Sequence, residues 1–278
     1  MDRKNEIGET KMEKQRQLEE YLKNLKKVAI AYSGGIDSSY LLFVANRVLP
    51  KKQVLAVIAN GIMVPRKDYE EAIAFLKENH FQYIEVPYKP LEITEFKENH
   101  KNRCYHCKKE LMTTLKRVVN ENGYEHLLDG KNVDDLTVYR PGNRATEEVG
   151  VISPLAKFEI SKEEIRQYSK ILGIPFWNKP SNSCLATRFP YNTNLTEKGL
   201  KKVEQSEEII KSIGIKKVRV RVHDTIARIE VNPEDFEIIL NNIKMENRNG
   251  KNIVEKIKDL GFSYVTLDLS GLKSGSFD

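Results

Sequence analysis

A glycine- and serine-rich loop lies between two apolar segments near the start of the chain. The short apolar run at 28–31 leads into Ser33, Gly34 and Gly35, and a second apolar stretch at 40–45 follows closely. This order predicts a strand, a tight turn and a helix. Glycines let backbone N–H groups approach a ligand, and the new helix adds its positive end. We therefore expect a phosphate site, most naturally for pyrophosphate, with hydroxyl donors from Ser33, Ser38 and Ser39.

Asp37 lies inside this loop, where a carboxylate would repel a bare phosphate. It makes sense as a magnesium ligand or as a helix cap. The loop is not the Gly-x-Gly-x-x-Gly of dinucleotide-binding proteins, and it lacks the lysine of the Walker loop. It resembles the pyrophosphate loop of the N-type ATP pyrophosphatase superfamily, whose members adenylate a substrate carbonyl and release pyrophosphate. An ordinary glycine-rich turn is the alternative.

The three cysteines form a second candidate site. Cys104 and Cys107 are three residues apart at or near the start of an expected helix, so they can face the same side. Cys184 lies in a later loop that could fold back over them. Three thiolates suit a [4Fe-4S] cluster with one iron open. Zinc with His106 as fourth ligand is a second interpretation, although chelation by His106 between two cysteines is strained. Inert cysteines are a third.

Arginines on an alternating segment form a third candidate site. Residues 217–223 alternate strictly, so Arg219, Arg221 and His223 share one face of an expected strand, and Arg228 lies on its neighbour. Such a cluster suits a second phosphate, apart from the ATP site. A solvated strand face with cross-strand pairs to Glu230 is the alternative.

The elements that position the loop alternate between strand and helix. Strands are expected after residue 27 and at 54–59, 83–86 and 126–129, and helices at 9–26, 65–79, 108–120 and 161–172. This predicts an α/β fold with a parallel sheet, helices on both faces and a ligand at the carboxyl ends of the strands. The loops at 33–39, 59–61 and 129–132 would then meet, which brings Asn60 and Asp129 to the ATP site.

A smaller α+β unit is expected to follow. Its elements are a helix at 196–212, a hairpin from 217–223 and 226–231, helices at 233–240 and 251–260, and a strand at 264–269. We expect an ATP pyrophosphatase domain at 1–178, an active-site linker loop at 179–194, and a domain at 195–278 for substrate phosphate binding and oligomerisation. The linker carries Cys184 and Arg188, and a purely structural linker would need neither.

The composition of the 278-residue chain indicates a globular protein. It is 40% hydrophobic and 31% charged, and no apolar run approaches the roughly 20 residues of a membrane span. The first residues lack the apolar core of a signal peptide, so a cytoplasmic protein without a membrane partner is expected. The net charge of +6 is compatible with nucleic acid, but an anionic small molecule explains it equally well.

Several motifs together make the chain similar to the LarE family of ATP-dependent sulfur transferases, which act in nickel-pincer nucleotide biosynthesis and lactate racemase maturation. The resemblance covers nearly the whole length and rests on the motifs at 31–38, 128–130, 135, 139–142, 188–191, 218–223 and 264–269. It implies adenylation of pyridinium-3,5-dicarboxylate mononucleotide, sulfur transfer to the activated carboxylate, and a ring-shaped homo-oligomer.

The resemblance also implies roles for individual residues. ATP would lie on Ser33, Gly34, Gly35, Asp37, Ser38, Asn60 and Asp129, with Mg²⁺ near Asp37 and Asp129. Arg188, Arg219, Arg221 and Arg228 would hold the substrate phosphate. The cluster-bearing members of the family have three cysteines, here Cys104, Cys107 and Cys184, and are thought to pass on a sulfide held at the open iron. Cys184, Asp37 and Arg188 would be the catalytic residues.

Three alternatives remain open. Other members of the family sacrifice the sulfur of one cysteine before the Arg-Phe-Pro-Tyr motif, where Ser183 and Cys184 stand here. A tRNA thiolation enzyme also pairs a pyrophosphate loop with three cysteines, but the chain has no terminal zinc-binding cysteine sets and no concentrated basic arm, so nucleic acid is not the expected partner. A nucleotide-sensing binding module leaves the cysteines unexplained. The sulfide donor is not identified by the sequence.

Overall fold

The chain divides into two compact units. A computed structural model describes residues 2–137, 141–179, 183–244 and 250–273. The first unit comprises Met1–Gly61, Arg66–Tyr88 and Cys104–Ser181, and the second comprises Ile62–Pro65, Lys89–Arg103 and Asn182–Asp278. Two short segments from the first half of the chain therefore belong to the second unit, a grouping that differs from the division expected from the sequence.

The first unit is built on a parallel sheet, as predicted. Its strands lie in the order β3-β2-β1-β4, with β1 at Val28–Ala31, β2 at Val54–Asn60, β3 at Tyr83–Pro87 and β4 at His126–Leu128. All four residues of β1 are buried, as expected for a central strand covered on both faces.

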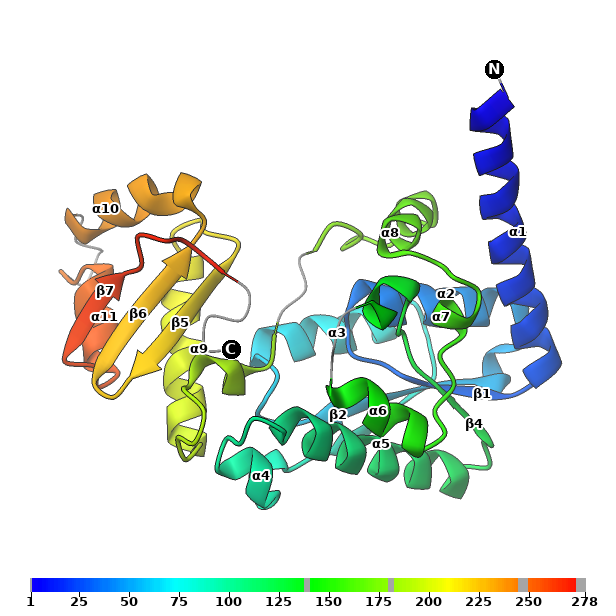
Figure 1. Ribbon diagram of the computed structural model, residues 1–278, viewed down its shortest axis with the longest axis horizontal. Coiled ribbons are helices and arrows are strands. Elements are labelled where there is room, and N and C mark those ends of the chain that lie inside the picture. Colours follow the sequence, from blue (N-terminus) through cyan, green and yellow to red (C-terminus); the bar gives the residue numbers. More distant parts are fainter. Residues whose placement is uncertain (1, 138–140, 180–182, 245–249, 274–278) are drawn as a thin grey trace. The chain divides into compact units, whose positions relative to one another are not determined.

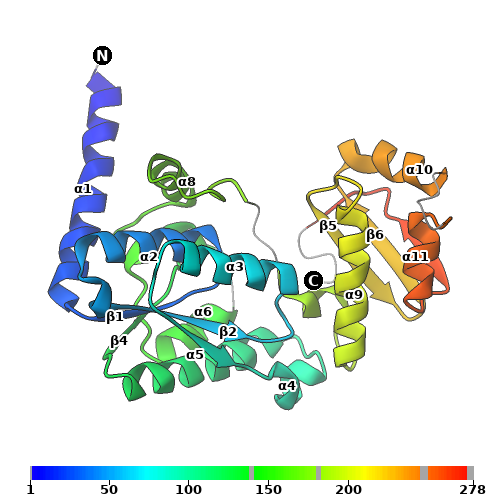
Figure 2. The ribbon, with the colours of Figure 1, turned by 180° about the vertical axis from the view of Figure 1, so that it is seen from behind.

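Helices cover both faces of this sheet. Figures 1 and 2 show α2 and α3 on one side and α5 on the other. The inward face of α5 places Met112, Leu115 and Val119 in one core with Ala29 and Val57 of the sheet. The elements outside the sheet are α1 (Asp2–Leu25), α2 (Ile36–Val48), α3 (Arg66–Glu78), α5 (Arg103–Glu121), α6 (Pro141–Glu148), α7 (Pro154–Lys157), α8 (Lys162–Ile171), and the 3₁₀ turns Lys51–Gln53 and Val133–Leu136.

The second unit is an α+β domain. Strands β5 (Val218–His223) and β6 (Ile226–Val231) form the predicted antiparallel hairpin, and β7 (Tyr264–Leu267) pairs with β6 in parallel. Its helices are α4 (Thr94–Lys97), α9 (Glu197–Lys211), α10 (Phe236–Lys244) and α11 (Ile253–Asp259), with 3₁₀ turns at Pro90–Glu92, Leu185–Arg188 and Pro233–Asp235.

The sheet of the second unit has an apolar face and a charged face. Val220 and Ile229 pack with Ile210 of α9 and Ile257 of α11 in one core. Because side chains alternate along a strand, Arg219, Arg221, Arg228 and Glu230 lie on the opposite face. Within the described ranges, no helix is long and apolar enough to cross a membrane.

Candidate functional site

The predicted phosphate loop links β1 to α2 in a tightly wound turn. Gly34 has φ +71°, and a Cβ atom there would lie 2.6 Å from the Cβ of Ala72, so the position requires glycine. Gly35 is the N-cap of α2. The Ser38 hydroxyl accepts a hydrogen bond from the Ser33 backbone N–H at 3.2 Å and lies 3.1 Å from the Ser33 hydroxyl. The loop thus aims a helix N-terminus and two hydroxyls at the carboxyl edge of the sheet.

A second loop, after β4, lies against the first. A Cβ atom on Gly130 would be 2.7 Å from the backbone nitrogen of Ser38, so the two chains pass in close contact. The Asn132 side-chain amide donates to Asp37 at 3.3 Å. Asp129 is buried at the start of this second loop. The predicted meeting of 33–39 with 129–132 is therefore confirmed, and Asn60 lies at the carboxyl end of the adjacent strand β2.

The carboxylate of Asp37 forms an ion pair with Lys162, the first residue of α8. Asp37 stands in the first turn of α2, but its side chain reaches Lys162 and Asn132 instead of capping that helix. Its side chain is 22% exposed. Within the described parts of the chain, no three carboxylate, imidazole or thiol groups are placed to hold a metal alone. One or two carboxylates completed by substrate phosphates are nevertheless the usual magnesium environment, and Asp37 and Asp129 supply that donor type.

Lys108 of α5 is a further basic residue near Asp129. Burial lowers its pKa, and the Asp129 carboxylate partly offsets this effect. Sequence reasoning missed Lys108, Asn132 and Lys162. Lys162 follows Ser161, which caps α8 with Glu164 as predicted, but the capping pattern says nothing about Asp37. Only the tertiary fold brings residues 37 and 162 together.

Two of the three cysteines lie in the first turns of α5, as predicted. Cys104 is exposed and Cys107 is partly buried. The Tyr88 hydroxyl is 2.7 Å from the backbone oxygen of Cys107 and 3.4 Å from its Sγ atom. Burial raises the pKa of the Cys107 thiol, and the hydrogen bond from Tyr88 lowers it in part. The His106 ring makes an edge contact with Tyr105. Cys184 belongs to the second unit, so the three-cysteine ligand set stays a prediction.

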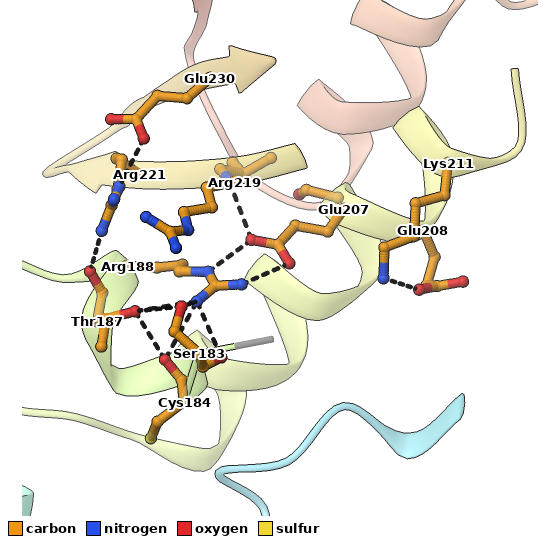
Figure 3. A network of polar contacts seen from close by, with 12 residues as sticks. Ser183, Cys184, Thr187, Arg188, Glu207, Glu208, Lys211, Arg219, Arg221 and Glu230 are labelled. Carbon is orange, nitrogen blue, oxygen red and sulfur yellow. Dashed lines mark hydrogen bonds and ion pairs between the residues drawn. The ribbon is translucent and has the colours of Figure 1, made fainter. Parts of the chain in front are cut away.

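The arginines of the second unit form a charged cluster with two buried glutamates (Figure 3). Arg221 Nε contacts Glu230 at 3.1 Å, and both side chains are at most 2% exposed. Arg228 contacts the other oxygen of Glu230 at 3.0 Å. The predicted shared face of Arg219, Arg221 and His223 is confirmed by their alternate positions on β5, and Arg228 lies opposite Arg221 on the neighbouring strand β6, as predicted. The cross-strand pairs to Glu230 are present as well.

Arg219 differs from its neighbours in this cluster. It is partly exposed, and its NH1 group donates to the Lys273 carbonyl at 2.8 Å. Burial and the nearby Arg221 and Arg188 lower the pKa of Arg219, yet an arginine stays protonated at neutral pH. Its remaining N–H groups make it the member best suited to receive a phosphate.

Arg188 is deeply buried beside Glu207 of α9, a residue that sequence reasoning missed. The pair is joined at 2.7 Å, and the two side chains are 2% and 3% exposed. An acidic residue on an amphipathic helix gives no sequence signal for such a pairing, since most glutamates on helices are solvated.

Comparisons with known proteins agree with this geometry. The NAD synthase family model matches residues 12–123. An uncharacterized protein of Synechocystis is 37% identical, with 97% of each chain covered. The pyridinium-3,5-bisthiocarboxylic acid mononucleotide synthase of Lactiplantibacillus plantarum is 34% identical over 91% of this chain and 90% of its own. An uncharacterized protein of Methanocaldococcus jannaschii is also 34% identical, over 92% and 94%.

Proposed function

We propose that this chain, which belongs to the LarE family of ATP-dependent sulfurtransferases together with the pyridinium-3,5-bisthiocarboxylic acid mononucleotide synthase of L. plantarum, acts on pyridinium-3,5-dicarboxylate mononucleotide. It would activate a carboxylate of this mononucleotide with ATP and convert it to a thiocarboxylate. The observation that carries the proposal is the loop at 33–38, with its helix N-terminus and paired serine hydroxyls.

The chemistry at the loop is an adenylation. The substrate carboxylate attacks the α-phosphorus of ATP, the bond to the β-phosphate breaks, and pyrophosphate leaves. The N–H groups at the start of α2 and the hydroxyls of Ser33 and Ser38 stabilise the departing charge. Mg²⁺, when bound by Asp37 and Asp129, would offset phosphate charge further. Lys162 is the cation already present beside Asp37.

The second half of the reaction replaces oxygen by sulfur. A sulfur nucleophile attacks the carbonyl carbon of the acyl adenylate, the bond from that carbon to the phosphate oxygen breaks, and AMP leaves. A [4Fe-4S] cluster held by Cys104, Cys107 and Cys184 would supply the sulfide. The partly buried thiol of Cys107 with its Tyr88 contact suits cluster ligation, since hydrogen bonds to the ligand sulfurs tune such centres. Arg219, on the same face of the hairpin as Arg221 and Arg228, would orient the substrate phosphate.

A coupled assay tests this function. The protein is incubated anaerobically with ATP, Mg²⁺, sulfide and pyridinium-3,5-dicarboxylate mononucleotide. Pyrophosphate release that depends on the mononucleotide, with AMP and a thiocarboxylate product found by mass spectrometry, is expected. An ATP analogue with a methylene bridge between the α- and β-phosphates is the control and should give no product. Pyrophosphate release with nicotinate adenine dinucleotide but not with the mononucleotide contradicts the substrate assignment.

We also propose a homo-oligomer, as the family resemblance implies. Light scattering coupled to gel filtration measures the molar mass of the particle against the 32.1 kDa of one chain. A particle of one chain's mass at all protein concentrations contradicts it.

A further inference from the structure

The turn that carries Cys184 is built around a buried cation. Arg188 and Glu207 form a two-point pair, with Nε–Oε1 at 2.7 Å and NH2–Oε2 at 3.0 Å. A buried charge that loses its partner is costly, so a pair this enclosed is held in one geometry. Figure 3 shows the guanidinium between Glu207 and the turn.

The third nitrogen of the guanidinium faces the turn itself. NH1 lies 3.0 Å from the Ser183 carbonyl oxygen, 2.6 Å from the Ser183 hydroxyl and 3.2 Å from the Cys184 carbonyl oxygen. It is also 2.9 Å from the Thr187 hydroxyl, which in turn donates to the Cys184 carbonyl at 2.8 Å. One side chain thus joins the start and the end of the turn.

The same turn is fixed to the rest of the second unit. Glu207 Oε1 accepts a bond from the Val220 backbone N–H of β5 at 3.0 Å, so the arginine's partner is itself held by the sheet. Arg221 NH1 donates to the Thr187 carbonyl. The Leu185 N–H donates to the Met63 carbonyl at 3.0 Å. These contacts tie the turn to α9, to β5 and to the segment 62–65.

We propose that Arg188 is a positioning residue for Cys184 and does not bind the substrate phosphate. To reach a phosphate, its guanidinium would have to give up Glu207 or the turn inside a site where it is 2% exposed. Arg219 is partly exposed and contacts a carbonyl, so it can bind a phosphate without breaking an ion pair recorded among the described residues. The inference uses the proposed function only in taking Cys184 as the cysteine that must be placed.

The test measures the reactivity of Cys184 without ATP, substrate or iron. In the protein with Cys104→Ser and Cys107→Ser, Cys184 is the remaining thiol, because the chain has three cysteines. Its alkylation rate with iodoacetamide is followed by mass spectrometry, and hydrogen exchange is followed at residues 183–188. Arg188→Lys keeps the positive charge but lacks the planar guanidinium that bonds Glu207 and the turn at once. We therefore expect the alkylation rate of Cys184 and the hydrogen-exchange rate at 183–188 each to rise by about tenfold.

Two further variants separate positioning from a general loss of folding. Glu207→Gln removes the other half of the pair and should raise the same two rates. Arg117→Lys, in an exposed pair with Glu121 on α5, is the matched control and should change neither. Circular dichroism checks that each variant is folded. If both Arg188→Lys and Glu207→Gln are folded and leave both rates unchanged, the proposal is overturned.

Mononucleotide affinity is the second measurement, because a phosphate ligand and a positioning residue should affect it differently. Arg188→Lys keeps the positive charge near Arg219 and removes no phosphate contact, so it should change the Kd of the mononucleotide by less than about twofold while lowering kcat for sulfur transfer. Arg219→Lys should weaken mononucleotide binding without changing the alkylation rate of Cys184. A tenfold loss of mononucleotide affinity in Arg188→Lys with unchanged Cys184 reactivity makes Arg188 a phosphate ligand and overturns the proposal. Because the thiol measurement needs no turnover, it stands even if the proposed substrate is wrong.

Discussion

Lys162 neutralises Asp37 at the mouth of the phosphate loop. The two residues are far apart in the chain, yet Lys162, the first residue of α8, places its ammonium group on the Asp37 carboxylate in the first turn of α2. The negative charge of Asp37 inside the proposed phosphate site is thereby compensated before any ligand binds.

Replacing Lys162 with Gln should weaken ATP binding most strongly when no metal is present. The substitution removes one positive charge and leaves Asp37 uncompensated, and both changes repel phosphates. We expect the Kd of ATP in EDTA to rise by about tenfold or more, the loss of one charge-assisted contact. With Mg²⁺ the loss should be smaller, since the cation can bind the freed Asp37. Isothermal titration calorimetry measures both values.

Lys170→Gln is the matched control, since this lysine is exposed on the same helix. An equal loss of affinity in the two variants shows that the effect of Lys162 is only general surface charge. If Lys162→Gln loses more ATP affinity with Mg²⁺ than without it, the idea that Mg²⁺ takes the place of Lys162 beside Asp37 is wrong.

The variant Asp37→Ala should abolish adenylation and keep the fold. Its side chain and that of Lys162 are each 22% exposed, so the lysine keeps contact with water when its partner is removed and the free energy of unfolding should change little. Substrate-dependent pyrophosphate release should fall by about a hundredfold or more, since a metal at the phosphates contributes several kcal/mol. A variant that releases pyrophosphate at close to the original rate shows that Asp37 holds no metal.

Arg219 and Arg221 should respond differently to replacement by alanine. Arg219→Ala should weaken mononucleotide binding by about tenfold, because one charge-assisted bond contributes about 1.5–3 kcal/mol, and should leave ATP binding unchanged. Arg221→Ala removes a buried partner of Glu230 and should lower the free energy of unfolding by about 3 kcal/mol. Urea denaturation and calorimetry separate the two effects. Equal losses of ATP and mononucleotide affinity in a folded Arg219→Ala protein place this arginine at the ATP site.

Tyr88→Phe should move the alkylation of Cys107 to higher pH. Burial already raises the pKa of this thiol, and the Tyr88 hydroxyl opposes that rise by stabilising the thiolate. Removing the hydroxyl therefore raises the pKa further, and at any fixed pH below it the reactive thiolate becomes scarcer. The pH profile of labelling is measured in protein with Cys104→Ser and Cys184→Ser. Tyr264→Phe, exposed on β7, is the control. If the pH profile of Cys107 labelling is unchanged in Tyr88→Phe, the Tyr88 hydroxyl donates only to the Cys107 backbone carbonyl and does not stabilise the thiolate.

The sequence predicts the parts of the site that are local in the chain. Gly34, Gly35 and Ser38 form a loop whose conformation is set by its own residues and by the strand and helix on either side. Alternation along β5 likewise predicts that Arg219 and Arg221 share a face. The compensating partners, by contrast, come from distant elements. Lys162, Glu207 and Tyr88 carry no local pattern that connects them with Asp37, Arg188 and Cys107.

The fold shows the same division. The helices α3, α8 and α9 and the apolar strands were predicted close to their observed bounds, because burial requires their pattern. The two longest helices, α1 and α5, begin several residues before their predicted starts at 9 and 108. The short helices α4 and α7 were not predicted, since four residues are too few for helical periodicity. The grouping of 62–65 and 89–103 with the second unit depends on long-range contacts such as Asn99 to the Pro190 carbonyl at 2.7 Å, which composition does not reveal.

The source of the transferred sulfur separates the two mechanisms that the family resemblance leaves open. If the three cysteines hold a cluster, protein reconstituted anaerobically should contain iron and sulfide, and given sulfide it should form more than one product per chain. Replacing Cys104, Cys107 or Cys184 by Ala should each remove the iron and the sulfur transfer but spare pyrophosphate release, because the phosphate loop contains none of them. Iron analysis measures the cluster content of each variant, and intact-protein mass spectrometry after turnover measures whether a cysteine has lost its sulfur. If product stops at one sulfur per chain and Cys184 loses the mass of one H₂S, then Cys184 is consumed as the sulfur source, and a catalytic cluster is excluded.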